Sequence, residues 1–383
     1  MKINCIKTHH IRCQLSEPFG FSQWSYSQRN VLLVEVISTD GVSGWGECYG
    51  PADVIQGAVE KFYAPRIIGM DALSTDQVWH HMWRSSLDFA RSGVMMAAMS
   101  GIDMAMWDLK GKLNNQSVSQ LMGGACRDRV PCYATGMYFQ DLPEDELLTQ
   151  LVEEAVTYSK QGFKAMKIKV GKNPDFDEKL IIAMRKALPS TILAADSNHA
   201  YDLPEAIRIG RVLDEQGYKW FEEPLSPEHP ALFRQLQDKI DLPVATGECE
   251  QTRYGFSKLI AAGGVQLVQA DLAYCGGPSE ALKIRTIASA SGLNMIPHVW
   301  GTQLNLAAAT HFLATAYSEP GRAESKPLYL EYDRTENPLR DEIYKVNVDV
   351  INGEAIVPTA PGLGVEIDLK ALAQFTVCAT ETK

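Results

Sequence analysis

Three short stretches decide the fold of this 383-residue chain: ILAAD at 192–196, WFE at 220–222 and VATGE at 244–248. Each is an apolar run that ends in an acidic residue, and the three acids are 26 residues apart. That interval matches one repeating unit made of a strand, a helix and the loops between them. The spacing therefore predicts three successive strands of a barrel, each carrying a carboxylate to the same end.

Outward from these stretches, short apolar runs alternate with amphipathic helices from Val130 onward. One predicted helix covers residues 175–188, and another begins near Pro204, a suitable residue for a first helical turn. The predicted strands end near Thr135, Lys169, Asp196, Glu222, Glu248, Asp271, His298 and Glu331. Eight strands interleaved with helices indicate a (β/α)-barrel, whose chemistry lies at the carboxyl ends of its strands.

The two ends of the chain have a different pattern of apolar and polar residues. Residues 31–37 and 42–47 are apolar runs joined at Asp40-Gly41, which predicts a hairpin, and residues 94–112 have helical periodicity. A second hairpin is predicted around Asn352-Gly353. We therefore expect an α+β capping domain at 1–125, the barrel at 126–340, and a segment at 341–383 that returns to the cap.

Composition excludes several classes of function. The net charge of −11 argues against nucleic acid or an anionic membrane surface as the main partner, because both need a basic footprint. No secretory signal or membrane-spanning stretch is evident, and the eight cysteines form no CxxC pair, which is typical of reduced thiols. We expect a cytoplasmic protein that binds a small anionic molecule and assembles as a homo-oligomer.

The three acids Asp196, Glu222 and Glu248 are candidate metal ligands. Acids at loop starts commonly cap helices or form salt bridges, but three in register at barrel strand ends favour a metal site. Ligation by oxygen alone favours Mg²⁺ over Zn²⁺. Three carboxylates would leave coordination positions for substrate oxygens and water.

Lys167 and Lys169 are candidates for a catalytic base. They flank Ile168, and the two-residue period of a strand places both ammonium groups on one face. Facing the barrel interior, the two like charges would lower each other's pKa, so that one lysine could be neutral near pH 7. The alternative is a strand edge that faces solvent.

Asp271 and His298 are candidates for a second proton carrier on the far side of the barrel. They close adjacent predicted strands, and an Asp–His contact would fix the imidazole tautomer and raise its pKa. A barrel histidine can also be purely structural. Glu331 would hydrogen-bond a substrate carboxylate opposite the metal. Together these residues predict abstraction of a proton next to a carboxylate, with the metal stabilising the enediolate.

The ordered set of strand-end residues resembles the enolase superfamily, in particular the mandelate racemase subgroup. The matching residues are Lys167-Ile168-Lys169, Asp196-Ser197-Asn198, Glu222-Glu223-Pro224, Gly247-Glu248, Asp271, His298 and Glu331, with the helix at 100–112 as a further match. The resemblance implies an α+β cap over a (β/α)7β barrel. It also implies that Lys167 contacts the substrate carboxylate, that Lys169 and His298 are opposed acid/base groups, and that Asp271 orients His298.

Shorter motifs resemble cycloisomerases of that subgroup, which open galactose-derived acid sugars in lactone or 3,6-anhydro form to 2-keto-3-deoxy acids. These motifs are GWGECYGP at 44–51, YATG at 133–136, PHVWGT at 297–302 and EYDRT at 331–335. A dehydratase or racemase of acid sugars would need nearly the same site. A metal-dependent lactone hydrolase, or a barrel kept only for binding, are more distant alternatives.

Substrate specificity is expected from the cap, through the loop at 19–24 and the segment at 48–50. The alternative for the aromatic residues of that loop is ordinary packing. The candidate substrate-binding residues are Gln23, Trp24, Tyr49, Asn198, His199 and Trp300.

Overall fold

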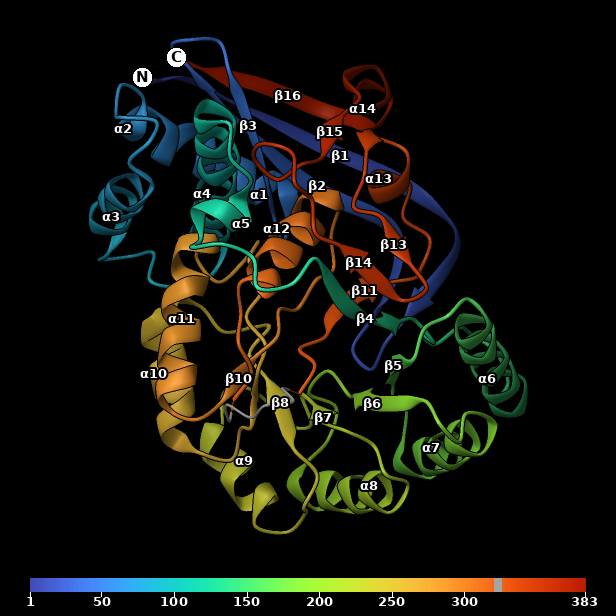
Figure 1. Ribbon diagram of the computed structural model, residues 1–383. Coiled ribbons are helices and arrows are strands. Elements are labelled where there is room, and N and C mark those ends of the chain that lie inside the picture. Colours follow the sequence, from blue (N-terminus) through green and yellow to red (C-terminus); the bar gives the residue numbers. More distant parts are fainter. Residues whose placement is uncertain (320–325) are drawn as a thin grey trace.

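Eight parallel strands form a barrel in the computed structural model, which describes residues 1–319 and 326–383. The strands are β4 (Arg129–Thr135), β5 (Ala165–Lys169), β6 (Ile192–Asp196), β7 (Phe221–Glu222), β8 (Val244–Thr246), β9 (Leu267–Val268), β10 (Asn294–Met295) and β11 (Leu330–Asp333). Each strand from β4 to β9 pairs with the next along the chain, and β11 pairs with β4. This order brings the last strand back beside the first (Figure 1).

One helix follows each strand from β4 to β10 and packs outside the barrel (Figure 1). These helices are α6 (Glu144–Lys160), α7 (Pro174–Ala187), α8 (Leu203–Glu215), α9 (Pro230–Gln237), α10 (Thr252–Ala262), α11 (Pro278–Ala290) and α12 (Gln303–Ala314); the short α13 (Pro338–Asp341) follows β11. Local sequence fixes several helix starts. Asp202 accepts a hydrogen bond from the backbone of Glu205, whose side chain reaches back to form a capping box. The predicted (β/α)7β barrel is confirmed.

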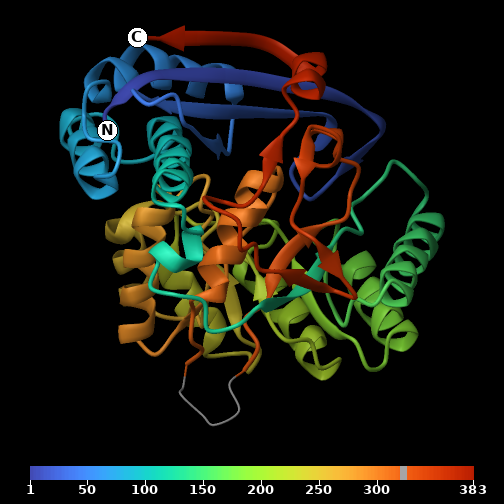
Figure 2. The same ribbon diagram turned by 45° about the horizontal axis from the view of Figure 1, so that its top comes forward.

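The cap is an antiparallel sheet with helices against it. Its strands are β1 (Ile3–Gly20), β2 (Ser25–Ser38), β3 (Ser43–Cys48) and β16 (Thr376–Thr382), in the order β16-β1-β2-β3. Its helices are α1 (Ala52–Gly57), the π-helix η1 (Ala58–Tyr63), α2 (Ala64–Ile67), α3 (Thr75–Ser86), α4 (Val94–Asn114), α5 (Val118–Leu121) and α14 (Leu369–Phe375). Figure 2 shows this sheet above the barrel, with both chain ends in it.

The backbone of helix α4 packs directly against the backbone of strand β3. A Cβ added to Gly46 would lie 2.2 Å from the carbonyl oxygen of Gly101. Only a residue without a side chain allows this approach. Helix α4 and strand β3 therefore form one tightly packed unit of the cap.

The C-terminal segment serves both parts of the molecule. β13 (Val350–Ile351) and β14 (Glu354–Ile356) form the predicted hairpin, with φ of 52° at Asn352 and 75° at Gly353, as a type I′ turn requires. β14 pairs with β4, so the hairpin extends the barrel sheet. β12 (Tyr344–Val346) pairs with β15 (Glu366–Ile367), and β16 completes the cap.

The fold differs from the sequence-based expectation at several positions, and β8, β9 and β10 end at Thr246, Val268 and Met295, two or three residues before the predicted ends. β1 was not predicted, because its exposed positions are charged or polar and hide the strand pattern. Glu331 is the second residue of β11 and not its end. Phe19 belongs to β1 and is a buried packing residue beside Tyr138, so for this residue the alternative of ordinary packing holds.

All eight cysteines are free thiols, as the sequence predicted. Among the described residues, no helix combines the length and the apolarity that crossing a bilayer requires.

Candidate active site

The carboxyl ends of the barrel strands bring the three predicted metal ligands together. One carboxylate oxygen from each of Asp196, Glu222 and Glu248 lies within 4.8 Å of the other two. In octahedral Mg²⁺ coordination, ligand oxygens are about 3 Å apart when adjacent and about 4 Å apart when opposite. The three side chains therefore fit the predicted ion with only small movements, and the first two are fully buried.

Electrostatics at this triad also favour a cation. Burial, together with Asp196 and Glu331, raises the pKa of Glu222 to about 7 despite the attraction of Lys167. The indole of Trp220 and the amide of Gln269 donate to Glu222 Oε2 at 3.0 and 2.7 Å, which fixes the carboxylate. A divalent ion would relieve the repulsion among these carboxylates.

The two lysines of β5 lie beside these carboxylates. Lys167 Nζ contacts Glu222 Oε1 closely, Glu331 Oε1 at 2.9 Å and Asp196 Oδ2 at 3.4 Å. Lys169 Nζ lies 2.6 Å from Asp196 Oδ2 and 2.7 Å from Asn198 Oδ1. Both ammonium groups point inward, as the strand period predicted.

The predicted fall in the lysine pKa values is wrong for the side chains as they stand. Burial, and for Lys169 the charge of Lys167, would lower the pKa, but the neighbouring carboxylates outweigh both and raise the pKa of each lysine. Sequence reasoning counted the like charges and missed how close the acids of β6 and β7 lie. A cation that neutralises Asp196 and Glu222 would make the rise in the pKa values of the two lysines smaller.

His298 and Asp271 form the expected dyad. His298 Nδ1 lies 2.6 Å from Asp271 Oδ2, while His298 Nε2 lies 3.6 Å from Glu248 Oε2. Burial would lower the pKa of His298, but Glu248 and the hydrogen bond to Asp271 raise it to about 10. These neighbours favour the protonated form of the imidazole, which is aimed at the carboxylate triad.

Glu331 lies on the wall between the two proton carriers. Its carboxylate accepts hydrogen bonds from Thr135 Oγ1 at 2.6 Å and from the backbone N–H of Val299 at 2.9 Å. Burial would raise its pKa, but Lys167 and His298 lower it to about 2. Glu331 and Lys167 thus pair with each other below the pocket, and neither lines it.

A pocket above the triad gathers all six candidate substrate-binding residues. Its lining comprises Phe21, Gln23, Trp24, Tyr26, Tyr49, Tyr138, Lys169, Asn198, His199, Glu248, Cys249, His298 and Trp300. The cap loop closes over it, because Gln23 Nε2 donates to the carbonyl of Asn198 at 2.7 Å. Trp24 is 57% exposed and forms the outer rim.

Several residues that support the site escaped sequence analysis. Asn305 Nδ2 donates to Asp271 Oδ1 at 3.1 Å, and its backbone N–H donates to Glu47 of the cap at 3.1 Å. Glu47 lies in strand β3 and is buried against the start of helix α12. This burial raises the pKa of Glu47 to about 7. Gln269 carried a usable signal, because it lies two residues before Asp271 and so on the same face of the strand that the sequence predicts there, although β9 itself ends at Val268. Glu47 lies in the GWGECYGP motif but had no role assigned to it, whereas Asn305 and the pocket residue Tyr138 carried no signal.

Comparison with known proteins agrees with this architecture. Residues 5–123 match the family described as mandelate racemase / muconate lactonizing enzyme, N-terminal domain, and residues 150–371 match the family described as Enolase C-terminal domain-like. The D-galactarolactone cycloisomerase of Agrobacterium fabrum is 38% identical over 376 residues, covering 98% of this chain and 99% of that protein.

Further relatives match most of the chain. The 3,6-anhydro-D-galactonate cycloisomerase of Zobellia galactanivorans has a crystal structure with a TM-score of 0.89 and 39% identity, over 99% of this chain and 100% of that one. The arabinonate dehydratase of Saccharolobus solfataricus is 33% identical over 88% of each chain.

One related crystal structure holds the predicted ion. A mandelate racemase/muconate lactonizing protein from Paracoccus denitrificans, complexed with magnesium, has a TM-score of 0.85 and 27% identity over 100% of this chain and 99% of that one. From the fold, the strand-end residues and these matches, the chain belongs to the enolase superfamily, in the mandelate racemase / muconate lactonizing enzyme family, and is an enzyme.

Proposed function

We propose that this enzyme is a Mg²⁺-dependent cycloisomerase of galactose-derived acid sugars in lactone or 3,6-anhydro form. One observation carries the proposal. Lys169 at the end of β5 and His298 after β10 line the same pocket from opposite sides of the barrel, and the carboxylate triad lies on the strands between them. The two cycloisomerase relatives, each matched over nearly the full chain, support the choice of substrate.

Asp196, Glu222 and Glu248 would hold the Mg²⁺ ion. When bound there, the ion supplies positive charge beside the substrate carboxylate and so stabilises an enediolate. The protein supplies the rest of the site. Lys167 neutralises Glu222 and Glu331 beneath the pocket, and Trp220 keeps Glu222 in place.

Lys169 and His298 would carry the protons. One of the pair takes the α-proton from carbon, and the electron pair of that C–H bond forms the new double bond of the enediolate. The other donates a proton to the ring oxygen as its bond to the β-carbon breaks. The product enol takes up a proton at the former β-carbon and becomes a 2-keto-3-deoxy acid, so the reaction is a net isomerisation of the substrate.

Asp271 would act as a positioning residue in this scheme. Its hydrogen bond at His298 Nδ1 leaves Nε2 facing the pocket and Glu248. Asn305 and the backbone N–H of Ala273 hold the other carboxylate oxygen at 3.1 and 2.7 Å. The imidazole therefore keeps one orientation through the reaction.

The test is to incubate the enzyme and Mg²⁺ with galactarolactone and with 3,6-anhydro-galactonate in D₂O. We expect a 2-keto-3-deoxy acid that carries one deuterium at its deoxy carbon, seen by NMR. Ring opening to the simple hydroxy acid, without deuterium on carbon, would contradict the proposal and support lactone hydrolysis.

An acid-sugar dehydratase is the second candidate, and the similarity to an arabinonate dehydratase favours it. The same residues would act, with His298 or Lys169 protonating a departing hydroxyl group in place of a ring oxygen. Consumption of open-chain aldonates or aldarates, with neither cyclic substrate turned over, would select this candidate.

A further inference from the structure

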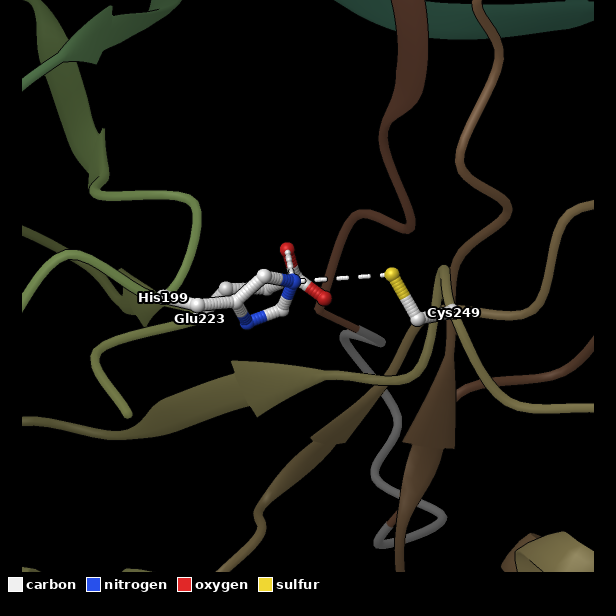
Figure 3. Close-up of side chains that lie close together, drawn as sticks. All are labelled: His199, Glu223 and Cys249. Carbon is white, nitrogen blue, oxygen red and sulfur yellow. Dashed lines mark hydrogen bonds and ion pairs between the residues drawn. The ribbon is translucent and has the colours of Figure 1, made fainter. Parts of the chain in front are cut away.

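A second cluster of potential ligands lies beside the carboxylate triad and has no part in the chemistry above. It consists of His199, Glu223 and Cys249, whose ligand atoms all lie within 4.8 Å of one another. Figure 3 shows the imidazole over the carboxylate of Glu223, with the thiol of Cys249 facing it from the other side. The loops after β6, β7 and β8 each supply one member of this cluster, while the triad takes Asp196 and Glu222 from the ends of β6 and β7 and Glu248 from two residues beyond β8.

The backbone is bent so that both clusters lie at the same end of the barrel. Consecutive residues of a regular strand point to opposite faces, which would separate Glu223 from Glu222. However, φ is positive at Glu223 (44°) and at His199 (66°), a conformation that is uncommon for residues with a side chain. Such conformations are costly and cluster at functional sites.

The distances suit a tetrahedral ion with soft ligands. His199 Nε2 lies 3.5 Å from Cys249 Sγ and 2.9 Å from Glu223 Oε2. Zn²⁺ bound by nitrogen, sulfur and oxygen at its usual bond lengths places such atoms about 3.3–3.5 Å apart. The contact between His199 and Glu223 would have to open by about 0.4 Å, and Glu223 and Cys249 already lie within 4.8 Å of each other.

Glu223 is the observation that points to a ligand. Its side chain is fully buried, and within the described part of the chain neither carboxylate oxygen has a hydrogen-bond partner. The 2.9 Å contact between Glu223 Oε2 and His199 Nε2 lacks the alignment of a hydrogen bond. Burying a carboxylate that has no hydrogen-bond partner costs free energy of folding unless a cation binds to it.

The histidine is also prepared for ligation. His199 Nδ1 lies 3.3 Å from the carbonyl oxygen of Leu225. Metal-bound histidines commonly donate their second ring N–H to such a carbonyl, which leaves the lone pair of the other nitrogen free. Here that other nitrogen is Nε2, which faces Glu223 and Cys249.

We propose that His199, Glu223 and Cys249 form a second metal site, selective for a thiophilic divalent cation such as Zn²⁺ and separate from the all-oxygen Mg²⁺ site. Three protein ligands leave the fourth tetrahedral position open. His199 and Cys249 line the substrate pocket, so an ion here stands where the acid sugar must enter.

The experiment is a Co²⁺ titration of the full-length enzyme in saturating Mg²⁺. Co²⁺ reports the ligands directly, because a thiolate ligand gives a charge-transfer absorption in the near ultraviolet that oxygen ligands do not give. We expect this absorption to saturate at one equivalent of Co²⁺ and to disappear when Zn²⁺ is added. In Cys249→Ser it should be absent, and in His199→Gln the affinity should fall at least about tenfold.

Cys378→Ser is the matched control, because Cys378 is also an exposed thiol but lies in β16 of the cap. Its absorption should equal that of the unmodified enzyme. Circular dichroism of each variant shows whether the fold is kept. Absence of the absorption in the unmodified enzyme, or its persistence in Cys249→Ser, would overturn the second site and leave the cluster as an ion pair beside a free thiol.

Discussion

At the scale of single residues, the opposed pair Lys169 and His298 determines the chemistry. Replacing Lys169 by Ala, or His298 by Asn, is expected to lower kcat by about 10²–10⁴-fold, because a positioned acid or base contributes about that much. The measurement is product formation with the cyclic acid sugar that the unmodified enzyme consumes, with circular dichroism to confirm the fold. Full activity in either variant would show that the assigned role is wrong.

Lys172→Ala is the control for the lysine. Lys172 lies three residues beyond Lys169 and lines a different pocket, which contains neither Lys169 nor His298. Its removal should leave kcat within about twofold, since its charge takes no part in proton transfer. A comparable loss in both variants would point to a general effect of charge.

The metal ligands and the acid/base residues could be predicted from the sequence, because each is an ionisable residue at the end of an apolar run. The sequence could not place Glu223, because the direction of that side chain depends on a positive φ that no pattern reports. Likewise, the raised pKa values of Lys167 and Lys169 depend on distances across three strands. Local patterns identify residue types, while direction and charge balance require coordinates.

At the scale of elements, the contact between β3 and α4 leaves no room for a methyl group. Gly46→Ala is expected to lower the free energy of unfolding by about 1–3 kcal/mol, because the new Cβ would meet the backbone of α4. Urea unfolding measures this. Gly57→Ala is the control: nothing lies within 4 Å of its added Cβ, and it should be neutral or slightly stabilising. Equal losses would contradict the packing argument.

Helix α12 contains a buried histidine that makes stability depend on pH. His311 Nδ1 accepts from the backbone N–H of Ser119 at 3.3 Å, and Nε2 donates to the carbonyl of Leu363 at 3.1 Å. Protonation would break the first bond. Burial lowers the pKa of His311 from 6.5 to about 4, so the neutral form belongs to the folded state.

The unfolded chain therefore binds a proton at higher pH than the folded chain does. The contribution of His311 to stability is complete above pH 6.5 and is lost as pH falls to about 4, a change of about 3 kcal/mol. Urea unfolding of the enzyme and of His311→Gln across this range measures it. Equal pH dependence in the two proteins would show that other groups cause the effect.

At the scale of the whole molecule, Mg²⁺ should stabilise the fold, because the triad exists only when three strand ends meet. At a hundred times its Kd the ion would add about 2.7 kcal/mol to the free energy of unfolding. Thermal unfolding with and without EDTA measures this, and EDTA should inactivate the enzyme reversibly. Glu248→Gln should lose the stabilisation. An identical Mg²⁺ effect in that variant would place the ion elsewhere.

The regular spacing of the strand-end residues was enough to predict the barrel. The cap, in contrast, is completed by residues from opposite ends of the chain. No periodicity links β1 with β16, and the polar outer face of β1 hides it as a strand. The six pocket residues proposed from the cap and the loops do meet, but only the coordinates show that Gln23 ties the cap loop to Asn198.

The pairing of β1 with β16 also has a consequence for biosynthesis. The ribosome makes β1 before the whole barrel and β16 after it, so one edge of β1 stays without its partner while the barrel is synthesised. An unpaired strand edge is a template for aggregation. Charged and polar side chains along that strand, among them Lys7, His9 and Arg12, discourage other chains from pairing with this edge until the last strand arrives.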